Sequence, residues 1–260
     1  MPRYHIWTIG CQMNKADSGN IAAFLEQSGY RSTTKVDDAD IVVLNSCVVR
    51  QSAESKVANK IDSLRRFDSG KVLAVTGCIV ESDVEAMRRR FPRVDVFFAP
   101  QDIATLSAYL HDCDLVKSTA KGQSIPAKSR VSSLVNIMQG CNNFCSYCVV
   151  PYRRGREVSR PPADIVVEVE AAVADGAKEV VLLGQNVDSY GHGLAGSLTL
   201  ADLLEKLNRV DGLARIRFLT SHPKDMSEQL IEAIASLDKV CENISLPFQA
   251  GDDAILKAMR

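Results

Sequence analysis

Three cysteines lie close together in the middle of the chain, at Cys141, Cys145 and Cys148. Their C-x3-C-x2-C spacing offers three thiolates from one short loop. A [4Fe–4S] cube has four irons, so three cysteines leave one iron without a protein ligand. That open iron can bind a small molecule and pass it an electron, whereas a closed four-cysteine site mainly relays charge. The spacing therefore favours a reactive iron–sulfur cluster.

The alternatives for this loop are a structural zinc site, a disulfide and a chance grouping. Zinc ribbons use paired C-x2-C units with four ligands, and the sequence has no second pair. Disulfides need an oxidising compartment, and the N-terminal residues show neither a signal peptide nor a long apolar run. Eight cysteines without such a signal indicate a reducing cytoplasm, which is the location we expect.

The composition is that of a soluble globular protein, with 46% hydrophobic and 24% charged residues among 260. No stretch approaches the length of a membrane span. A net charge of −1 gives no global electrostatic case for binding nucleic acid. Basic residues do cluster locally, at Arg153, Arg154, Arg156 and Arg160.

The first half of the chain alternates apolar runs with helical patterns. This alternation predicts a parallel sheet covered by helices on both faces, a doubly wound α/β domain over residues 1–118. Strands are expected at 4–9, 41–45, 72–76 and 94–98, and helices at 16–27, 53–67, 82–90 and 102–110.

A second alternation follows residues 119–130, which are polar, contain Gly and Pro, and are expected to be a linker. Residues 131–260 predict a partial (β/α) barrel. Four strand–helix units leave a barrel incomplete, and parallel sheets must be buried on both faces, so we expect a C-terminally truncated chain. Strands are expected at 133–138, 179–183, 216–220 and 243–246, and helices at 162–174, 200–210, 227–236 and 252–259.

Three further cysteines, Cys11, Cys47 and Cys78, each follow a predicted strand directly. Parallel strands of a doubly wound sheet end at one edge, where ligands bind. A glycine precedes two of them, Gly10 and Gly77, and lets the backbone approach a bulky cluster. The alternative is that each is an ordinary buried cysteine. Their equivalent positions predict a second cluster, again with one open iron.

The middle cysteine loop, with the aromatic Tyr147 before its last cysteine, resembles the radical S-adenosylmethionine (SAM) superfamily. In that superfamily the open iron binds the amino and carboxylate groups of SAM, and an electron cleaves the sulfonium to give a 5′-deoxyadenosyl radical. Two clusters in this order resemble the methylthiotransferase family, in the branch that modifies tRNA. The matching motifs are residues 10–14, 45–47, 77–78, 140–148, 154–160, 183–187, 220–223 and 246–249.

The resemblance implies a transferase that uses SAM and two [4Fe–4S] clusters. It would convert N6-isopentenyladenosine next to the tRNA anticodon into its 2-methylthio derivative by radical C–H activation. The alternatives are methylthiolation of a ribosomal protein or of threonylcarbamoyladenosine in tRNA, and a non-catalytic metal module that docks RNA through its arginines. The implied partners are tRNA and an electron donor such as flavodoxin or ferredoxin, and we expect a monomer.

The same resemblance implies ligand and SAM contacts. Cys141, Cys145 and Cys148 would hold the cluster that cleaves SAM, and Cys11, Cys47 and Cys78 the auxiliary cluster that carries the transferred sulfur. Tyr147 would pack beside the SAM adenine, Gly184, Gln185 and Asn186 would contact its amino group, and Ser221 and His222 would lie near its ribose. Arg154, Arg156 and Arg160 would bind the SAM carboxylate or a tRNA phosphate. We expect Cys113 and Cys241 to be structural.

Overall fold

The computed structural model describes residues 1–47, 51–64, 70–80, 83–115 and 131–260, with 51–54 described in backbone only. The chain divides into two compact units, Met1–Ile125 and Pro126–Arg260. The linker predicted at 119–130 lies outside the described residues, so its bounds remain a prediction. Each unit is described by itself.

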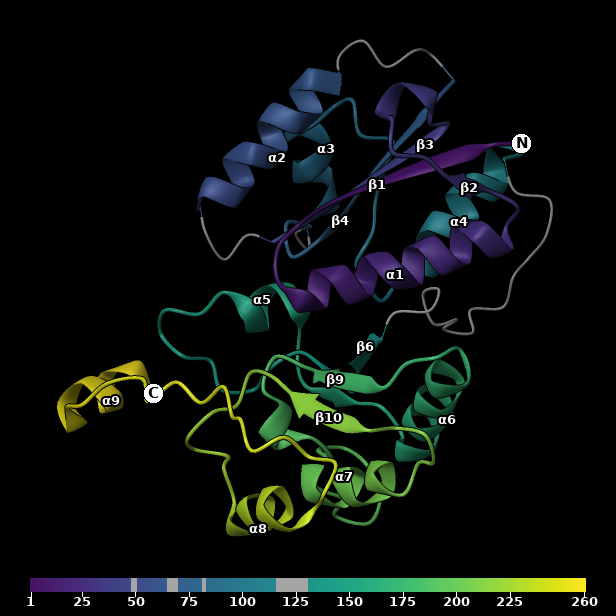
Figure 1. Cartoon of the computed structure of the whole chain (residues 1–260). Helices are drawn as coiled ribbons and strands as arrows, with labels where there is room; N and C mark the ends of the chain where they lie inside the picture. The colour runs from purple at the N-terminus through teal and green to yellow at the C-terminus, as the bar shows by residue number, and fades with distance from the viewer. Residues whose placement is uncertain (48–50, 65–69, 81–82, 116–130) are drawn as a thin grey trace. The chain divides into compact units, whose positions relative to one another are not determined.

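The first unit is built on a parallel five-stranded sheet (Figure 1). All residues of its two central strands are buried, as expected for strands covered on both faces. In spatial order, the strands are β2 (Arg31–Ser32), β1 (Arg3–Ile9), β3 (Ile41–Ser46), β4 (Val72–Gly77) and β5 (Val96–Phe97).

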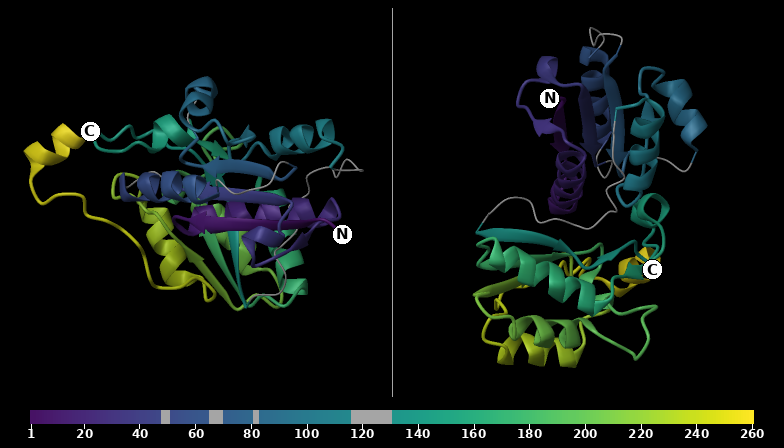
Figure 2. Two further views of the ribbon diagram at one scale, coloured as in Figure 1. Left: turned by 90° about the horizontal axis from the view of Figure 1, so that it is seen from above. Right: turned by 90° about the vertical axis from the view of Figure 1, so that its right-hand side faces the viewer.

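Helices cover both faces of this sheet (Figures 1 and 2). One face packs against α1 (Gln12–Gln27) and α4 (Ile103–Asp112), through a core that includes Ile21, Leu25, Leu106 and Val43. The other face packs against α2 (Gln51–Ser63) and α3 (Val84–Arg90), through a core that includes Val57, Met87 and Leu44. Alternate residues of β3 thus face opposite cores, and burial of each large aliphatic side chain stabilises the fold by about 1.5–3 kcal/mol.

The second unit contains a parallel sheet of β6 (Ser132–Asn136), β9 (Glu179–Leu183) and β10 (Arg215–Phe218), whose spatial order follows the sequence. Three helices pack on it through one core: α6 (Pro162–Ala174), α7 (Leu200–Asn208) and α8 (Glu228–Ser236). This arrangement is part of a (β/α) barrel. The predicted fold class, a doubly wound domain followed by a partial barrel, is confirmed.

Several short elements were not predicted. In the second unit these are the antiparallel ribbon of β7 (Met138–Gln139) and β8 (Val158–Ser159), the helix α5 (Val150–Arg154) and the 3₁₀ turn η3 (Val187–Ser189). They are too short to show a periodic pattern of apolar residues. A further helix, α9 (Asp253–Met259), ends the chain, and Asp252 caps it as the predicted helix 252–259 implies.

The strand predicted at 243–246 is wrong. Residues next to β10 form one isolated bridge, between Ile216 and Val240, and no strand follows it. Thr220 has a positive φ of 72°, which turns the chain away just beyond β10 and ends the ladder. Within the predicted strand, Ser245 O accepts a hydrogen bond from Ser221 N–H at 3.2 Å.

Among the described residues, no helix combines the length and the apolar character required to cross a bilayer.

Candidate metal centres

The cysteine loop of the second unit begins where the β7–β8 ribbon ends. Cys141 N–H donates to Gly155 O at 3.1 Å, and Cys148 N–H donates to Cys145 O at 2.9 Å. A Cβ on Gly140, whose φ is +79°, would lie 2.0 Å from Arg156 O. Only glycine therefore fits this close approach of the two ends of the loop.

The three thiols of this loop lie near enough to influence one another. Burial raises the pKa of Cys141 above its usual value, against a hydrogen bond from Asn143 N–H that lowers it. The Glu157 carboxylate and, to a smaller extent, the thiolates of Cys148 and Cys145 raise it further. Cys141 is buried, while Cys145 and Cys148 are half-buried. A cationic iron would replace the protons and offset this repulsion, since thiolates bind metals.

Contacts from distant residues fix the outside of the loop. The Glu157 carboxylate, 2% exposed, accepts from Asn142 N–H at 3.1 Å and lies 3.0 Å from His192 Nδ1. The Tyr147 hydroxyl donates to Gln249 Oε1 at 2.6 Å, although Tyr147 is 60% exposed. The loop is thus held by residues up to 102 positions away in the sequence.

The cysteines of the first unit follow three neighbouring strands, β1, β3 and β4. These strands end in register, with Ile9 beside Ser46 and Ser46 beside Gly77. Cys47 and Cys78 come one residue after that row, and Cys11 two residues after it. Because adjacent strands lie about 4.8 Å apart, the three backbones share one short edge of the sheet.

Their surroundings are those of a site at the surface of the unit. Cys11 is exposed, Cys47 is half-buried, and Cys78 is buried at 7% exposure yet belongs to neither hydrophobic cluster of this unit. Cys11 is also the N-cap of α1, so its side chain lies at the positive end of the helix dipole. Cys113 ends α4 instead, so the connecting helix carries it to the opposite edge of the sheet.

The donor groups of both sets, three thiols each, are of the kind that holds an iron–sulfur cluster. All eight cysteines lie in described parts of the chain, and no disulfide joins any of them. Within those parts, no three Cys, His, Asp or Glu side chains converge as the ligands of one metal ion do. A cube binds each thiolate through a different iron, so its ligands lie farther apart than those of a single ion.

Polar side chains at the ends of β9 and β10 face the cysteine loop of the same unit. Gln185 Oε1 accepts from Gly140 N–H at 2.5 Å. Asn186, 2% exposed, donates to Asp225 Oδ2 at 2.7 Å, and Asn143 donates to the same oxygen at 3.4 Å. Among the described residues, Asn186 Oδ1 is buried without a hydrogen-bond partner.

Asp188 joins the two residues expected near the SAM ribose. Its carboxylate accepts from the Ser221 hydroxyl and from His222 N–H, each at 2.9 Å. Burial raises the pKa of Asp188, the two hydrogen bonds lower it, and the nearby Asp225 raises it. The raised pKa shows that burial outweighs the hydrogen bonds.

The expected arginines are largely engaged within the protein. Arg154 is 5% exposed. Arg160 pairs with Glu168 at 2.7 Å and donates to Asn136 O at 2.5 Å. The Arg156 guanidinium lies 4.3 Å from the centre of the Phe144 ring. Gly184 is tightly packed, because a Cβ there would lie 2.6 Å from Met138 Cγ.

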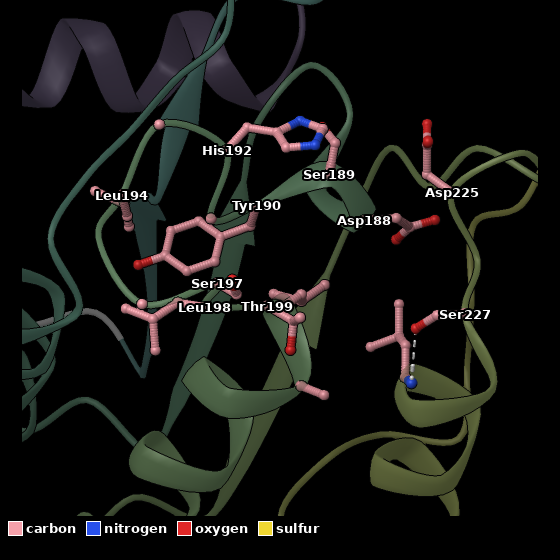
Figure 3. A pocket seen from close by; sticks show the side chains of 16 residues that line it. Asp188, Ser189, Tyr190, His192, Leu194, Ser197, Leu198, Thr199, Asp225 and Ser227 are labelled. Atoms are coloured by element: carbon pink, nitrogen blue, oxygen red, sulfur yellow. Dashed lines mark hydrogen bonds between the residues drawn. The ribbon is translucent and has the colours of Figure 1, made fainter.

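A cavity of about 580 Å³ opens between the loop after β9 and the first turns of α7 and α8 (Figure 3). Asp188 and Asp225 lie at one side of it, and Tyr190 and His192 come from the loop. Asp188, Asp225 and Glu157 were not predicted as site residues. For the two aspartates the available signal was their position in the loops that follow β9 and β10, since ligands of barrels collect there. Glu157 directly precedes β8 and gave no such signal.

Two family models match the chain. Residues 135–260 match the model described as the radical SAM superfamily, and residues 3–99 match the one described as uncharacterized protein family UPF0004. The fold of the second unit, its three-thiol loop and this match define a radical SAM domain.

Relatives cover the whole chain. A protein of Dehalococcoides mccartyi named tRNA-2-methylthio-N(6)-dimethylallyladenosine synthase is 51% identical over 100% of this chain and 60% of its own length. One of the same name from Thermoanaerobacter pseudethanolicus is 43% identical over 98% of this chain and 58% of its own length. The chain belongs to the radical SAM methylthiotransferase family. It spans about 60% of the length of these relatives.

Solved structures agree on the fold. The radical SAM methyltransferase TsrM of Kitasatospora setae superposes with a TM-score of 0.66, at 14% identity over 98% of this chain and 61% of its own. The cobalamin-dependent radical SAM enzyme OxsB superposes with a TM-score of 0.63, at 11% identity over 100% of this chain and 45% of its own. At these identities the likeness concerns the fold alone.

Proposed function

We propose that this chain is a radical SAM methylthiotransferase that acts on N6-isopentenyladenosine next to the tRNA anticodon and forms its 2-methylthio derivative. The observation that carries the proposal is the presence of two sets of three cysteines, one set within a single loop of the second unit and the other just after three strands of the first unit that end in register. The names of the relatives support tRNA as the substrate, over a ribosomal protein, and dimethylallyladenosine over threonylcarbamoyladenosine.

Each cysteine set is assigned one [4Fe–4S] cluster. Cys141, Cys145 and Cys148 hold the cluster that binds SAM, and Cys11, Cys47 and Cys78 hold the auxiliary cluster. When bound, these groups and SAM supply the hydrogen abstraction from an unactivated C–H and the methylated sulfur. The protein contributes binding and orientation around them.

The chain's own residues orient SAM at the strand ends of the second unit. Asn186 Oδ1 lacks a partner among the described residues and is the acceptor available to the SAM amino group. Gln185 keeps the cysteine loop in place through Gly140 N–H, and Asp188 orients Ser221 and His222 toward the ribose. Gly184 lets Met138 pack closely against the end of β9. We also assign to the SAM site Tyr147, within the cysteine loop, and Arg154, which follows it.

The proposal extends to partners and location. An electron donor of the flavodoxin or ferredoxin kind supplies the reducing electron. We place the protein in the cytoplasm, where thiols stay reduced, and propose that it acts as a monomer.

Anaerobic reconstitution with iron and sulfide tests the two-cluster assignment. The unchanged chain should bind about eight irons, and the triple variant Cys141→Ala/Cys145→Ala/Cys148→Ala about four, with no reductive cleavage of SAM. The variant Cys11→Ala/Cys47→Ala/Cys78→Ala should also bind about four but still cleave SAM. Cys113→Ala and Cys241→Ala are matched controls and should keep about eight.

Four irons in the unchanged chain, or SAM cleavage that survives loss of Cys141, Cys145 and Cys148, would contradict the proposal. The substrate is tested with tRNA that carries or lacks the isopentenyl group. Product should form only on the isopentenylated tRNA, detected as methylthio-adenosine by mass spectrometry. Product on a ribosomal protein instead would reassign the branch.

A further inference from the structure

Two buried asparagines lie directly behind the cysteines of the first unit. Asn14 sits in the first turn of α1, and Asn45 sits near the end of β3. Neither residue is exposed at all, each having 0% accessible surface. A buried amide destabilises a fold unless its polar atoms are hydrogen-bonded, so the bonds of this pair decide what it does.

All four side-chain polar atoms of the pair are bonded. Asn14 Nδ2 donates to Asn45 Oδ1 at 2.9 Å. Asn45 Nδ2 donates in return to the backbone oxygen of Asn14 at 2.8 Å and to Ser18 Oγ at 2.9 Å. Asn14 Oδ1 accepts from Cys11 N–H at 3.3 Å. The two amides thus join α1 to β3 by hydrogen bonds, and Asn14 also bonds the backbone of Cys11.

The pair also fills the space beside two glycines that precede cysteines. A Cβ on Gly10 would lie 2.2 Å from Asn14 Oδ1. A Cβ on Gly77, whose φ is +99°, would lie 2.6 Å from Asn45 Oδ1 and 2.3 Å from Ser46 O. Asn45 itself stands two residues before Cys47. The pair therefore contacts all three cysteine-bearing strand ends.

We propose that Asn14 and Asn45 are positioning residues that set the spacing of Cys11, Cys47 and Cys78 for their cluster. This inference rests on the proposed function, in which those cysteines bind iron. The residues act through the backbone, since Asn14 holds Cys11 N–H and Asn45 ties the end of β3 to the first turns of α1. Residues that orient metal ligands typically change metal affinity by about 10- to 100-fold when lost.

The test uses the full chain with Cys141, Cys145 and Cys148 changed to Ala, so that only the first unit can hold a cluster. The variant N14L/N45L replaces both amides with apolar groups of similar size, which leaves no buried partner unpaired between the two side chains. After reconstitution, it should lose iron to a ferrous chelator roughly 10-fold or more faster than its parent. Its reduced cluster should also give a changed electron paramagnetic resonance spectrum.

Thr76→Val is the matched control. Thr76 is also 0% exposed, lies beside Asn45 in the same row of the sheet, and donates its hydroxyl to Phe98 O at 2.8 Å, away from the cysteines. The Thr76→Val variant loses this one buried hydrogen bond and keeps every hydrogen bond of the asparagine pair. Its iron release and spectrum should match those of the parent.

The outcomes separate the two proposals. If the parent, the chain without Cys141, Cys145 and Cys148, binds no iron, the proposed cluster of the first unit is wrong. A parent that binds iron, with N14L/N45L equal to it in release rate and spectrum, overturns the positioning role alone. Should circular dichroism show N14L/N45L unfolded, the single variant N14A decides, because it removes both the acceptor for Cys11 N–H and the donor to Asn45. Unchanged iron release in folded N14A would equally overturn the role.

Discussion

Single residues at the strand ends of the second unit work through partners that are distant in sequence. Asp188 and Ser221 lie 33 positions apart, and Asn186 and Asp225 lie 39 apart. The two cysteine sets could be proposed as ligands from the sequence because three cysteines share one short loop and the others follow recognisable strands. The carboxylates were not, because a contact between two loops depends on how β9 and β10 pair, which no local pattern encodes.

The Ser221→Ala variant should raise the pKa of Asp188 further. The Ser221 hydroxyl stabilises the charged carboxylate and so lowers the pKa. Its removal leaves burial, the larger effect, less opposed. A pH titration of the Asp188 carboxyl signal by carbon NMR measures the shift. Ser227→Ala is the control, because Ser227 lines the same cavity but caps α8, and it should leave the pKa of Asp188 unchanged.

The raised pKa of Asp188 makes the stability of the folded protein depend on pH. Because the folded-state pKa of Asp188 is raised above the usual 3.8, the protonated carboxyl favours the folded state. This contribution is complete below pH 3.8 and is lost as the pH rises through the folded-state pKa. Asp188→Asn should therefore flatten the pH dependence of unfolding in this acidic range, and an unchanged dependence would contradict the assignment.

At the scale of helices and strands, long periodic segments were predicted well and short or polar ones were not. β9 and α6 have the predicted bounds, 179–183 and 162–174. α1 begins at Gln12, four residues before the predicted start at 16, because its first turn is polar and lacks the apolar spacing used to find helices. The predicted helix 227–236 begins at its cap in the structure: the Ser227 hydroxyl accepts from Leu230 N–H at 3.1 Å.

Thr199→Ala should destabilise the second unit by about 1 kcal/mol, the usual cost of losing an N-cap. Thr199 caps α7, where its hydroxyl accepts from Asp202 N–H at 3.3 Å and the Asp202 carboxylate accepts from Thr199 N–H at 2.8 Å. Chemical denaturation followed by circular dichroism measures the free energy of unfolding. Thr199→Ser keeps the capping oxygen and should cost far less, so equal losses in both variants would argue against the cap.

At the scale of the whole molecule, both units are α/β folds with their own cores, as the two alternating patterns predicted. What the patterns did not show is how the segment after β10 runs. It leaves several large apolar side chains in water, including Phe248 at 80% and Ile255 at 53% exposure. Exposed apolar side chains of this kind favour association or dye binding.

Phe248→Ser together with Ile255→Glu should therefore lower the fluorescence of a hydrophobic dye bound to the chain, with an unchanged circular dichroism spectrum. The reason is the loss of apolar surface from two exposed positions that belong to none of the described cores. Ile234→Ser is the opposite case: Ile234 is 7% exposed and part of the core, so its loss should raise dye binding. Equal dye binding before and after the double change would show that these side chains are covered in solution.

The equal lengths of β3 and β4 fix how far Cys47 and Cys78 lie from the start of their strands. Both strands run six residues from a paired start, Ile41 beside Val72, to a paired end, Ser46 beside Gly77. One extra residue inside either strand would turn the sulfur that follows to the opposite side of the pleat. Insertions should be tolerated in the loops and helices that connect the strands. They should not be tolerated between Ile41 and Cys47 or between Val72 and Cys78.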